Sequence, residues 1–195
     1  METNDQPLID AILAGDPQSF SFLVDRYKDL VFTLALRMLK HREEAEEVSQ
    51  DTFIKVFRSL NKFKGESKFS TWIYKITYHT CLDRLKKNKR EQHVFALDEY
   101  NDNQVETIDN ALDMMEKKER KQAIQECLQL LPSNDIALLT LFYFEGLSLE
   151  EIAKIVDLTA NNVKVKLFRS RKKLTGILRD KLEPEIIENY ERNGR

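Results

Sequence analysis

The sequence predicts an all-α protein made of two small helical domains. Hydrophobic residues make up 42% of the 195 residues, which is enough for compact cores. The chain has only 5 glycines and 4 prolines, too few for a β protein with many tight turns. Apolar residues recur at helical spacing along most of the chain, apart from one acidic stretch near the middle. These observations indicate helices packed on helices, with a linker between two groups of them.

The N-terminal elements are expected in the following order. A first helix runs from Leu8 to Ala14 and stops at Gly15. Asp16 caps a long second helix that has Pro17 in its first position. Its apolar face is formed by Phe20, Leu23, Val24, Tyr27, Val31, Leu34, Ala35 and Met38.

The next helix is expected over residues 41–60, with an acidic outer face in its first turns. It should bury Ala45, Val48, Phe53, Val56 and Phe57. A break over residues 61–69 contains Gly65, after which Ser70 caps a helix whose core positions include Ile73 and Ile76. Trp72 has two interpretations at this point, support of the core or contact with DNA.

Residues 62–90 hold nine basic side chains, with Glu66 and Asp83 as the only acids. Phe63, Phe69, Trp72, Tyr74 and Tyr78 lie among them. Cations that hold a backbone and flat rings that stack on bases are what a single-stranded nucleic acid requires. Aromatic residues at helical spacing are more often core, so the pattern alone leaves both interpretations open.

The formal charge changes sign along the chain. The net charge is +3 over residues 1–90, −7 over 91–119 and +2 over 120–195. We therefore expect a domain at 1–90, an acidic flexible linker at 91–119, a second domain at 120–182 and a polar tail at 183–195. The second domain should begin with a helix over 120–131 that stops at Pro132, followed by a helix that Ser133 caps and Gly146 ends.

Residues 148–174 predict a helix-turn-helix. Ser148 and Glu151 form a capping box before a short apolar helix, and Asp157 stands in the turn. In the second helix Val163, Leu167, Ser170 and Leu174 face inward. The remaining positions form a basic and amide face suited to the DNA major groove: Asn161, Asn162, Lys164, Val165, Lys166, Phe168, Arg169, Arg171 and Lys172. Between Leu158 and Leu182 there are eight basic residues and one acid.

Other classes of protein find little support in the sequence. Cys81 and Cys127 lie in apolar helical patterns, and the three histidines form no cluster, so we expect reduced cysteines and no metal site. No Gly-rich phosphate loop, nucleophile elbow or catalytic pair of carboxylates is visible, so we expect neither catalytic residues nor a cofactor. The chain shows neither a signal peptide nor a membrane span, and we expect a cytoplasmic protein.

Four ordered blocks resemble the extracytoplasmic-function, or group IV, sigma factors of bacterial RNA polymerase. The blocks are AEEVSQDTFIKVFRSL (45–60), FKGESKFSTWIYKIT (63–77), CLDRLKK (81–87) and LPSNDIALLTLFYFEGLSLEEIAKIV (131–156), which continues into the helix-turn-helix. The resemblance implies that the first domain is sigma region 2 and the second is sigma region 4. It implies core RNA polymerase as partner through its β′ coiled coil and β subunit, promoter DNA as ligand, and regulation by an anti-sigma factor.

The resemblance also assigns residues. It maps docking on the β′ coiled coil onto Glu46, Glu47, Gln50 and Asp51; a solvated helix face fits the same composition, and the resemblance favours docking. It maps recognition and melting of the −10 element onto Phe63, Lys64, Gly65, Glu66, Ser67, Lys68, Phe69, Trp72, Lys75, Tyr78 and His79. The resemblance also assigns recognition of the −35 duplex to the basic and amide face of the second helix of the helix-turn-helix, whose residues are listed above.

Four positions depart from the family pattern. Tyr78 and His79 stand where Arg and Asn are common, Asp157 stands where the turn usually has Gly, and Val165 replaces a small polar residue. These departures affect the promoter sequence that is read, not the role.

Two other functions remain as alternatives. A stand-alone helix-turn-helix regulator explains residues 148–174 but gives the block at 63–77 no purpose. It would bind a duplex site alone, whereas a sigma factor binds poorly without core polymerase. The other alternative is an enzyme, and detectable nucleotide hydrolysis by the pure protein would favour it.

Overall fold

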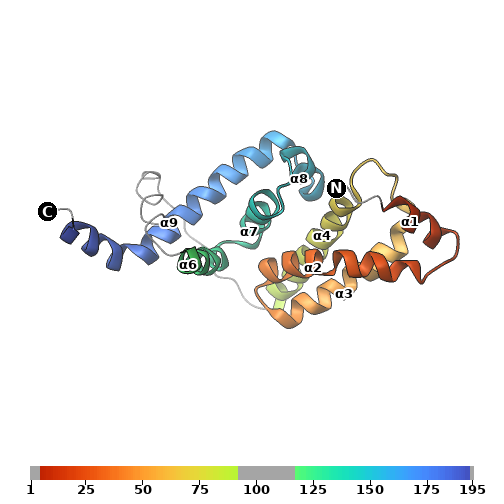
Figure 1. Ribbon diagram of the computed structural model, residues 1–195, viewed down its shortest axis with the longest axis horizontal. Helices are drawn as coiled ribbons and strands as arrows, with labels where there is room; N and C mark the ends of the chain where they lie inside the picture. The colour runs from red at the N-terminus through yellow and green to blue at the C-terminus, as the bar shows by residue number, and fades with distance from the viewer. Residues whose placement is uncertain (1–4, 92–116, 194–195) are drawn as a thin grey trace.

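The computed structural model describes residues 5–91 and 117–193, with side chains described for 5–88 and 124–180. Throughout these ranges the regular elements are helices, without a strand, which confirms the all-α prediction. Figure 1 shows them in order. They are α1 (Gln6–Leu13), α2 (Ser19–Leu39), α3 (Arg42–Ser59), the 3-10 turn η1 (Leu60–Lys62), α4 (Phe69–Glu91), α6 (Lys117–Leu130), α7 (Ser133–Leu139), the π-helical turn η2 (Thr140–Phe144), α8 (Leu149–Val156) and α9 (Ala160–Asn193).

The N-terminal helices form a bundle in which α2, α3 and α4 pack against one another and α1 closes one end (Figure 1). Amphipathic spacing explains the packing, because the buried residues of α2 recur every three or four positions. The core at the α1 end consists of Ile9, Leu23, Tyr27, Val31, Val56, Leu60, Phe69 and Ile73. The predicted core positions of the long second helix are thus buried, except that Phe20 and Val24 are half-buried.

The start of α2 differs from the prediction by two residues. The Asp16 carboxylate accepts hydrogen bonds from the Gln18 backbone N–H (3.0 Å) and the Ser19 hydroxyl (2.7 Å). This arrangement makes a turn over residues 17–18 before the helix begins. The predicted side-chain acceptor is therefore present, but it orders a turn that precedes α2.

Two other predicted caps are wrong. Helix α4 begins at Phe69, so Ser70 lies inside it. The Ser133 hydroxyl donates to the backbone carbonyl of Met38 at 2.8 Å, which ties the start of α7 to the end of α2. Ser and Thr hydroxyls can bond to backbone groups in several ways. Here the Ser133 hydroxyl bonds to Met38, which is distant in the sequence, instead of capping its own helix.

The predictions for α3 were also partly wrong. Ala45, Val48 and Val56 are buried as expected, but the Phe57 side chain is 45% exposed. Its ring lies 5.0 Å from that of Phe20 in an edge-to-face pair at the surface. Thr52 takes a place in the interior instead, because its hydroxyl donates to the carbonyl of Val48 and so needs no water.

The C-terminal helices pack around the first half of α9. Helices α6, α7 and α8 each lie against α9, and Ile136, Leu139, Leu141, Ile152 and Val163 are among the residues buried between them. The backbone of α9 continues as helix to Asn193, past residue 182 where the sequence predicted a polar tail. Most of the predicted acidic linker lies outside the described residues, while its last residues, 117–119, already belong to α6.

The two groups of helices share one apolar core. A single cluster contains Leu34, Met38 and Tyr78 from the N-terminal bundle together with Leu131 and Ile155 from the C-terminal helices. Helix α8 packs along α4, and α7 packs along α2. In Figure 1 these helices meet in the middle of the molecule, while α1 and the end of α9 lie at its two extremes. The predicted separation into two domains therefore coexists with extensive contact between them.

Candidate nucleic-acid interface

The helix-turn-helix is formed as the sequence predicts. The Ser148 hydroxyl accepts from the backbone N–H of Glu151 (3.1 Å), and the Glu151 carboxylate accepts from the backbone N–H of Ser148 (2.9 Å). That backbone hydrogen bond is the main reason why the pKa of Glu151 lies below its usual value. Asp157 ends α8 in the left-handed region, with φ 53° and ψ 48°. Thr159 then caps α9, since its hydroxyl accepts from the Asn162 N–H at 3.2 Å.

Helix α9 is held in place through its inner face. Val163, Leu167 and Ser170 are buried, as predicted, and Leu174 is half-buried. The Ser170 hydroxyl donates to the Asp135 carboxylate of α7 at 2.5 Å. Lys173 forms an ion pair with the same carboxylate at 2.8 Å. These contacts fix the rotation of α9 and hence the residues that face outward.

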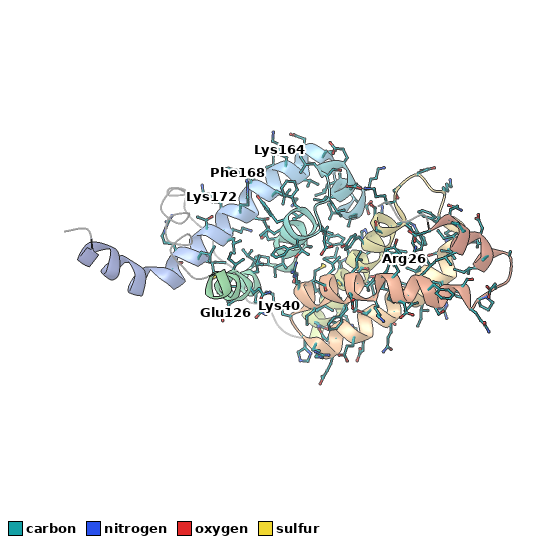
Figure 2. The ribbon with its side chains drawn as sticks, in the orientation of Figure 1. Arg26, Lys40, Glu126, Lys164, Phe168 and Lys172 are labelled. Atoms are coloured by element: carbon teal, nitrogen blue, oxygen red, sulfur yellow. The ribbon has the colours of Figure 1, made fainter. Side chains whose placement is uncertain are left out.

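The outward face carries the predicted residues for duplex reading. Figure 2 shows Lys164, Phe168 and Lys172 following one another along the side of α9 that faces away from α7. Phe168 is 58% exposed and Val165 is 41% exposed, so this face offers apolar side chains as well as polar ones. The other predicted positions on this face are also exposed, apart from the half-buried Lys172: Asn161, Asn162, Lys164, Lys166, Arg169 and Arg171.

Arg171 differs from its neighbours on α9. Its guanidinium donates to the Tyr143 hydroxyl at 3.2 Å and lies 6.0 Å from the Phe168 ring. Tyr143, which was not among the predicted site residues, thus extends the exposed face from α9 onto η2. The sequence shows Tyr143 only as a tyrosine close to the loop before the helix-turn-helix. It does not indicate that this side chain lies near α9.

In the N-terminal bundle three of the predicted aromatic residues form one cluster with edge-to-face and tilted rings. The ring centroids of Phe63, Phe69 and Trp72 lie 5.1 to 5.5 Å apart. Phe69 is buried against Tyr27, whereas Phe63 and Trp72 are half-buried. Phe69 is therefore placed to brace the loop rather than to present a ring at the surface, and its assignment to the −10 element stays a prediction.

Gly65 and its neighbours form the exposed loop that leads into α4. Gly65 has a φ of 72°, a conformation that favours glycine, and Lys64, Glu66 and Lys68 are exposed beside it. Ser67 is half-buried. The loop thus presents two lysines and backbone groups to the surroundings.

The remaining predicted −10 residues lie beneath the C-terminal helices. Lys75 donates to the Asp157 carboxylate at 2.5 Å, and this hydrogen bond is the main reason why the pKa of Asp157 is lowered. The His79 Nε2 atom lies 3.0 Å from the other Asp157 oxygen but outside hydrogen-bond geometry, so Lys75 makes the stronger contact. Tyr78 is buried, and its hydroxyl donates to Asn134 at 3.3 Å. Burial is the main cause of the raised pKa of Tyr78.

The predicted docking residues lie together on the outer face of α3. Glu46, Glu47, Gln50 and Asp51 are all exposed. Glu46 pairs with Arg42 at 2.9 Å, and Glu47 pairs with Arg84 at 2.7 Å. Ile54, which was not predicted to belong to this face, is 48% exposed one turn after Gln50 and Asp51. The face therefore combines acids with an exposed aliphatic side chain.

Comparisons with known proteins agree with this geometry. A family model described as Sigma-70 region 2 matches residues 23–91, and one described as Sigma-70, region 4 matches residues 121–174. The chain is 32% identical to the ECF RNA polymerase sigma factor SigW of Bacillus subtilis over 189 residues, which cover 92% of this chain and 100% of that protein. The chain belongs to the ECF RNA polymerase sigma factors.

Other sigma factors give the same result. The RNA polymerase sigma-H factor of Pseudomonas aeruginosa is 32% identical over 176 residues, covering 87% of this chain and 91% of that protein. The solved sigma factor RpoE of Bartonella quintana, in complex with the anti-sigma factor NepR, has a TM-score of 0.63 at 19% identity. It covers 83% of this chain and 98% of that chain, and at this identity the likeness shows the fold.

Within this sigma factor, the two matched regions contain the surfaces described above. Region 2 covers α3, the Gly65 loop and α4, and region 4 covers α7, α8 and the outward face of α9. Among the described residues there is no group of His, Cys, Asp and Glu side chains that could hold a metal ion. No helix in the described part of the chain combines the length and apolar character needed to cross a bilayer. Cys81 is buried, and its burial raises the pKa of the thiol to about 12.

Proposed function

We propose that this sigma factor reads the −35 duplex with the outer face of α9. The observation that carries the proposal is the exposed face of amides and cations on α9, the helix that follows the capped helix α8. Asn161 and Asn162 lie at the N-terminus of α9, where side chains reach base edges or phosphate. Lys164, Lys166 and Arg169 supply the charge that holds the backbone, and Val165 and Phe168 suit apolar contact with a thymine methyl group.

The Gly65 loop and the start of α4 are proposed to capture the −10 element as a single strand. Opening duplex DNA costs a few kcal/mol for each unstacked base, which capture of the base must offset. Lys64, Lys68 and Lys75 would neutralise phosphates, and the half-buried rings of Phe63 and Trp72 would stack or brace the loop. The function involves no covalent chemistry, so we propose no catalytic residue and no cofactor.

The outer face of α3 is proposed to dock on the β′ coiled coil of core RNA polymerase, in the cytoplasm where transcription takes place. Exposed acids and amides suit a basic partner surface. An anti-sigma factor is proposed as a regulator, because the relative RpoE was solved with one.

A gel-shift comparison tests the proposal against a stand-alone regulator. Genomic promoter fragments are incubated with the protein, with core polymerase, and with both. We expect specific shifted complexes only when both are present. A specific, high-affinity complex formed by the protein alone would favour the regulator instead.

A further inference from the structure

A buried carboxylate joins the start of α1 to α2. Asp5 is 7% exposed, and both of its carboxylate oxygens are used. The Arg26 guanidinium donates to Oδ1, and the Tyr27 hydroxyl donates to Oδ2 at 2.5 Å. Asp5 stands at the N-cap position of α1, yet its side chain makes no capping hydrogen bond there. The carboxylate is therefore committed to α2 instead of to its own helix.

Tyr27 carries this contact to the aromatic cluster at the base of the Gly65 loop. We define the aromatic cluster as Phe63, Phe69 and Trp72. The buried Tyr27 ring forms an edge-to-face pair with Phe69, with centroids 5.7 Å apart. Burial, and after it the hydrogen bond to Asp5, raises the pKa of the Tyr27 hydroxyl. The phenol therefore keeps the proton that it donates to Asp5.

The aromatic cluster closes the Gly65 loop at its base. Phe63 precedes the loop, Phe69 follows it as the first residue of α4, and their ring centroids lie 5.1 Å apart. Because the two ends of the loop meet in this pair, the position of Phe69 sets where the loop stands on the bundle. Helix α1 adds apolar support, since Ile9 is buried in the same core as Phe69 and Leu60 of η1.

A loop that is already in position captures a strand at lower cost than one that must first be ordered. Ordering a loop on binding removes backbone and side-chain freedom, and preorganisation lowers this cost. Accepting the proposed capture of the −10 strand by the Gly65 loop, we propose that Asp5 is a positioning residue for this loop. It holds Tyr27 against Phe69, and Phe69 fixes the base of the loop. Asp5 is buried, so it acts through these neighbours and not by touching DNA.

A purely structural role of Asp5 leads to a different expectation. Loss of the buried contact would then lower the stability of the bundle and the amount of active sigma factor, while the step in which DNA opens would keep its rate. Initial promoter binding and DNA opening must therefore be measured separately.

Two variants each remove one side of the contact between Asp5 and Tyr27. Tyr27→Phe removes the hydroxyl and keeps the ring that packs on Phe69. Asp5→Ala removes the carboxylate. The double variant completes a cycle that shows whether the two side chains act as one unit. Thr52→Val is the matched control, because it also removes a buried hydroxyl of the bundle, one that donates within its own helix to the carbonyl of Val48.

Two readouts follow the loop, and circular dichroism checks that each variant is folded. Trp72 is the only tryptophan of the chain, so acrylamide quenching of its fluorescence in the full-length protein reports on the aromatic cluster. The second readout is the kinetics of the holoenzyme on a promoter selected by transcription in vitro, which gives the initial binding constant and the rate of DNA opening. A variant with Lys64→Ala and Lys68→Ala is measured alongside, because it tests strand capture by the loop itself.

We expect Asp5→Ala and Tyr27→Phe each to open the promoter about fivefold more slowly at an unchanged initial binding constant, because a hydrogen bond to a charged group contributes on this scale. Trp72 should become more accessible to acrylamide in both. The double variant should be no slower than the slower single variant, and Thr52→Val should change neither readout.

The outcomes separate this inference from the proposed strand capture. If the Asp5 and Tyr27 variants open the promoter at the wild-type rate while the lysine variant is slow, the positioning role is refuted and strand capture stands. Additive losses in the double variant would mean that the two residues act separately, which also refutes the positioning role. If the lysine variant opens the promoter normally, the −10 assignment of the loop fails and this inference fails with it.

Discussion

At the scale of single residues, Ser148 and Asp157 set the geometry of the helix-turn-helix. Ser148 satisfies a backbone N–H at the start of α8, and Asp157 ends the same helix in the left-handed region. Helix α8 is only eight residues long, so its own backbone hydrogen bonds contribute little net stability. The cap and the buried Ile152 and Ile155 therefore decide whether it forms.

Removing the cap should weaken the folded state. Ser148→Ala is expected to lower the free energy of unfolding by about 1 kcal/mol, because the Glu151 N–H loses its acceptor. Chemical denaturation measured by circular dichroism gives this difference. Ser148→Asp keeps an acceptor oxygen and should stay close to the wild type. An Ala variant as stable as the wild type would contradict the cap assignment.

Several residue-level features were predictable because they depend on local spacing. The capping box and the inward positions Val163, Leu167 and Ser170 follow from helical periodicity within one segment. The tertiary partners of these and other residues were not predictable. Ser133 binds the carbonyl of Met38, and Phe57 packs on Phe20 at the surface, because segments far apart in the sequence happen to meet there.

At the scale of elements, α9 carries the proposed duplex contacts. Replacing Lys166 and Arg169 by alanine should weaken binding of the holoenzyme to −35 duplex. The slope of log K against log salt should become shallower by about 0.9 for each phosphate that these side chains no longer neutralise. Filter binding over a salt series gives the slope. Lys28→Ala, an exposed cation on α2, is the control. A slope equal to the wild type's would argue against phosphate contacts at these residues.

Helix α3 makes a separate prediction. Asp51→Arg should weaken association with core polymerase while leaving the fold intact, because residue 51 is exposed and its acid is proposed to face a basic partner. Pull-down with purified core enzyme measures the effect, and circular dichroism checks the fold. Asp25→Arg makes the same charge reversal on α2 and should bind normally. Unchanged association of the Asp51 variant would remove α3 from the docking surface.

The elements themselves were largely predictable, and their ends were not. The long helices were placed correctly by their apolar period, and Gly146, with a φ of 65°, ends its helix as expected. Helix α4 starts one residue before its predicted cap, and α9 continues past Pro184 to Asn193. Helix ends depend on competition between a few hydrogen bonds, which composition does not resolve.

At the scale of the whole molecule, the arrangement of the two domains could not be predicted from the sequence. The amphipathic faces of α2, α4 and α7 each indicate burial, but periodicity does not say which face covers which. The structure joins them in one core and places Asp157 beside Lys75. The predicted domain boundaries at residues 90 and 120 stay predictions, since most of the acidic segment between them lies outside the described residues.

The central claim is that this chain directs core RNA polymerase to promoters. The most direct measurement is transcription in vitro by core enzyme on a genomic library, with the RNA 5′ ends sequenced in the presence and absence of the protein. We predict discrete start sites that appear only with the protein and share two upstream elements, one read as duplex and one as single strand. Start sites that do not change when the protein is added would contradict the account.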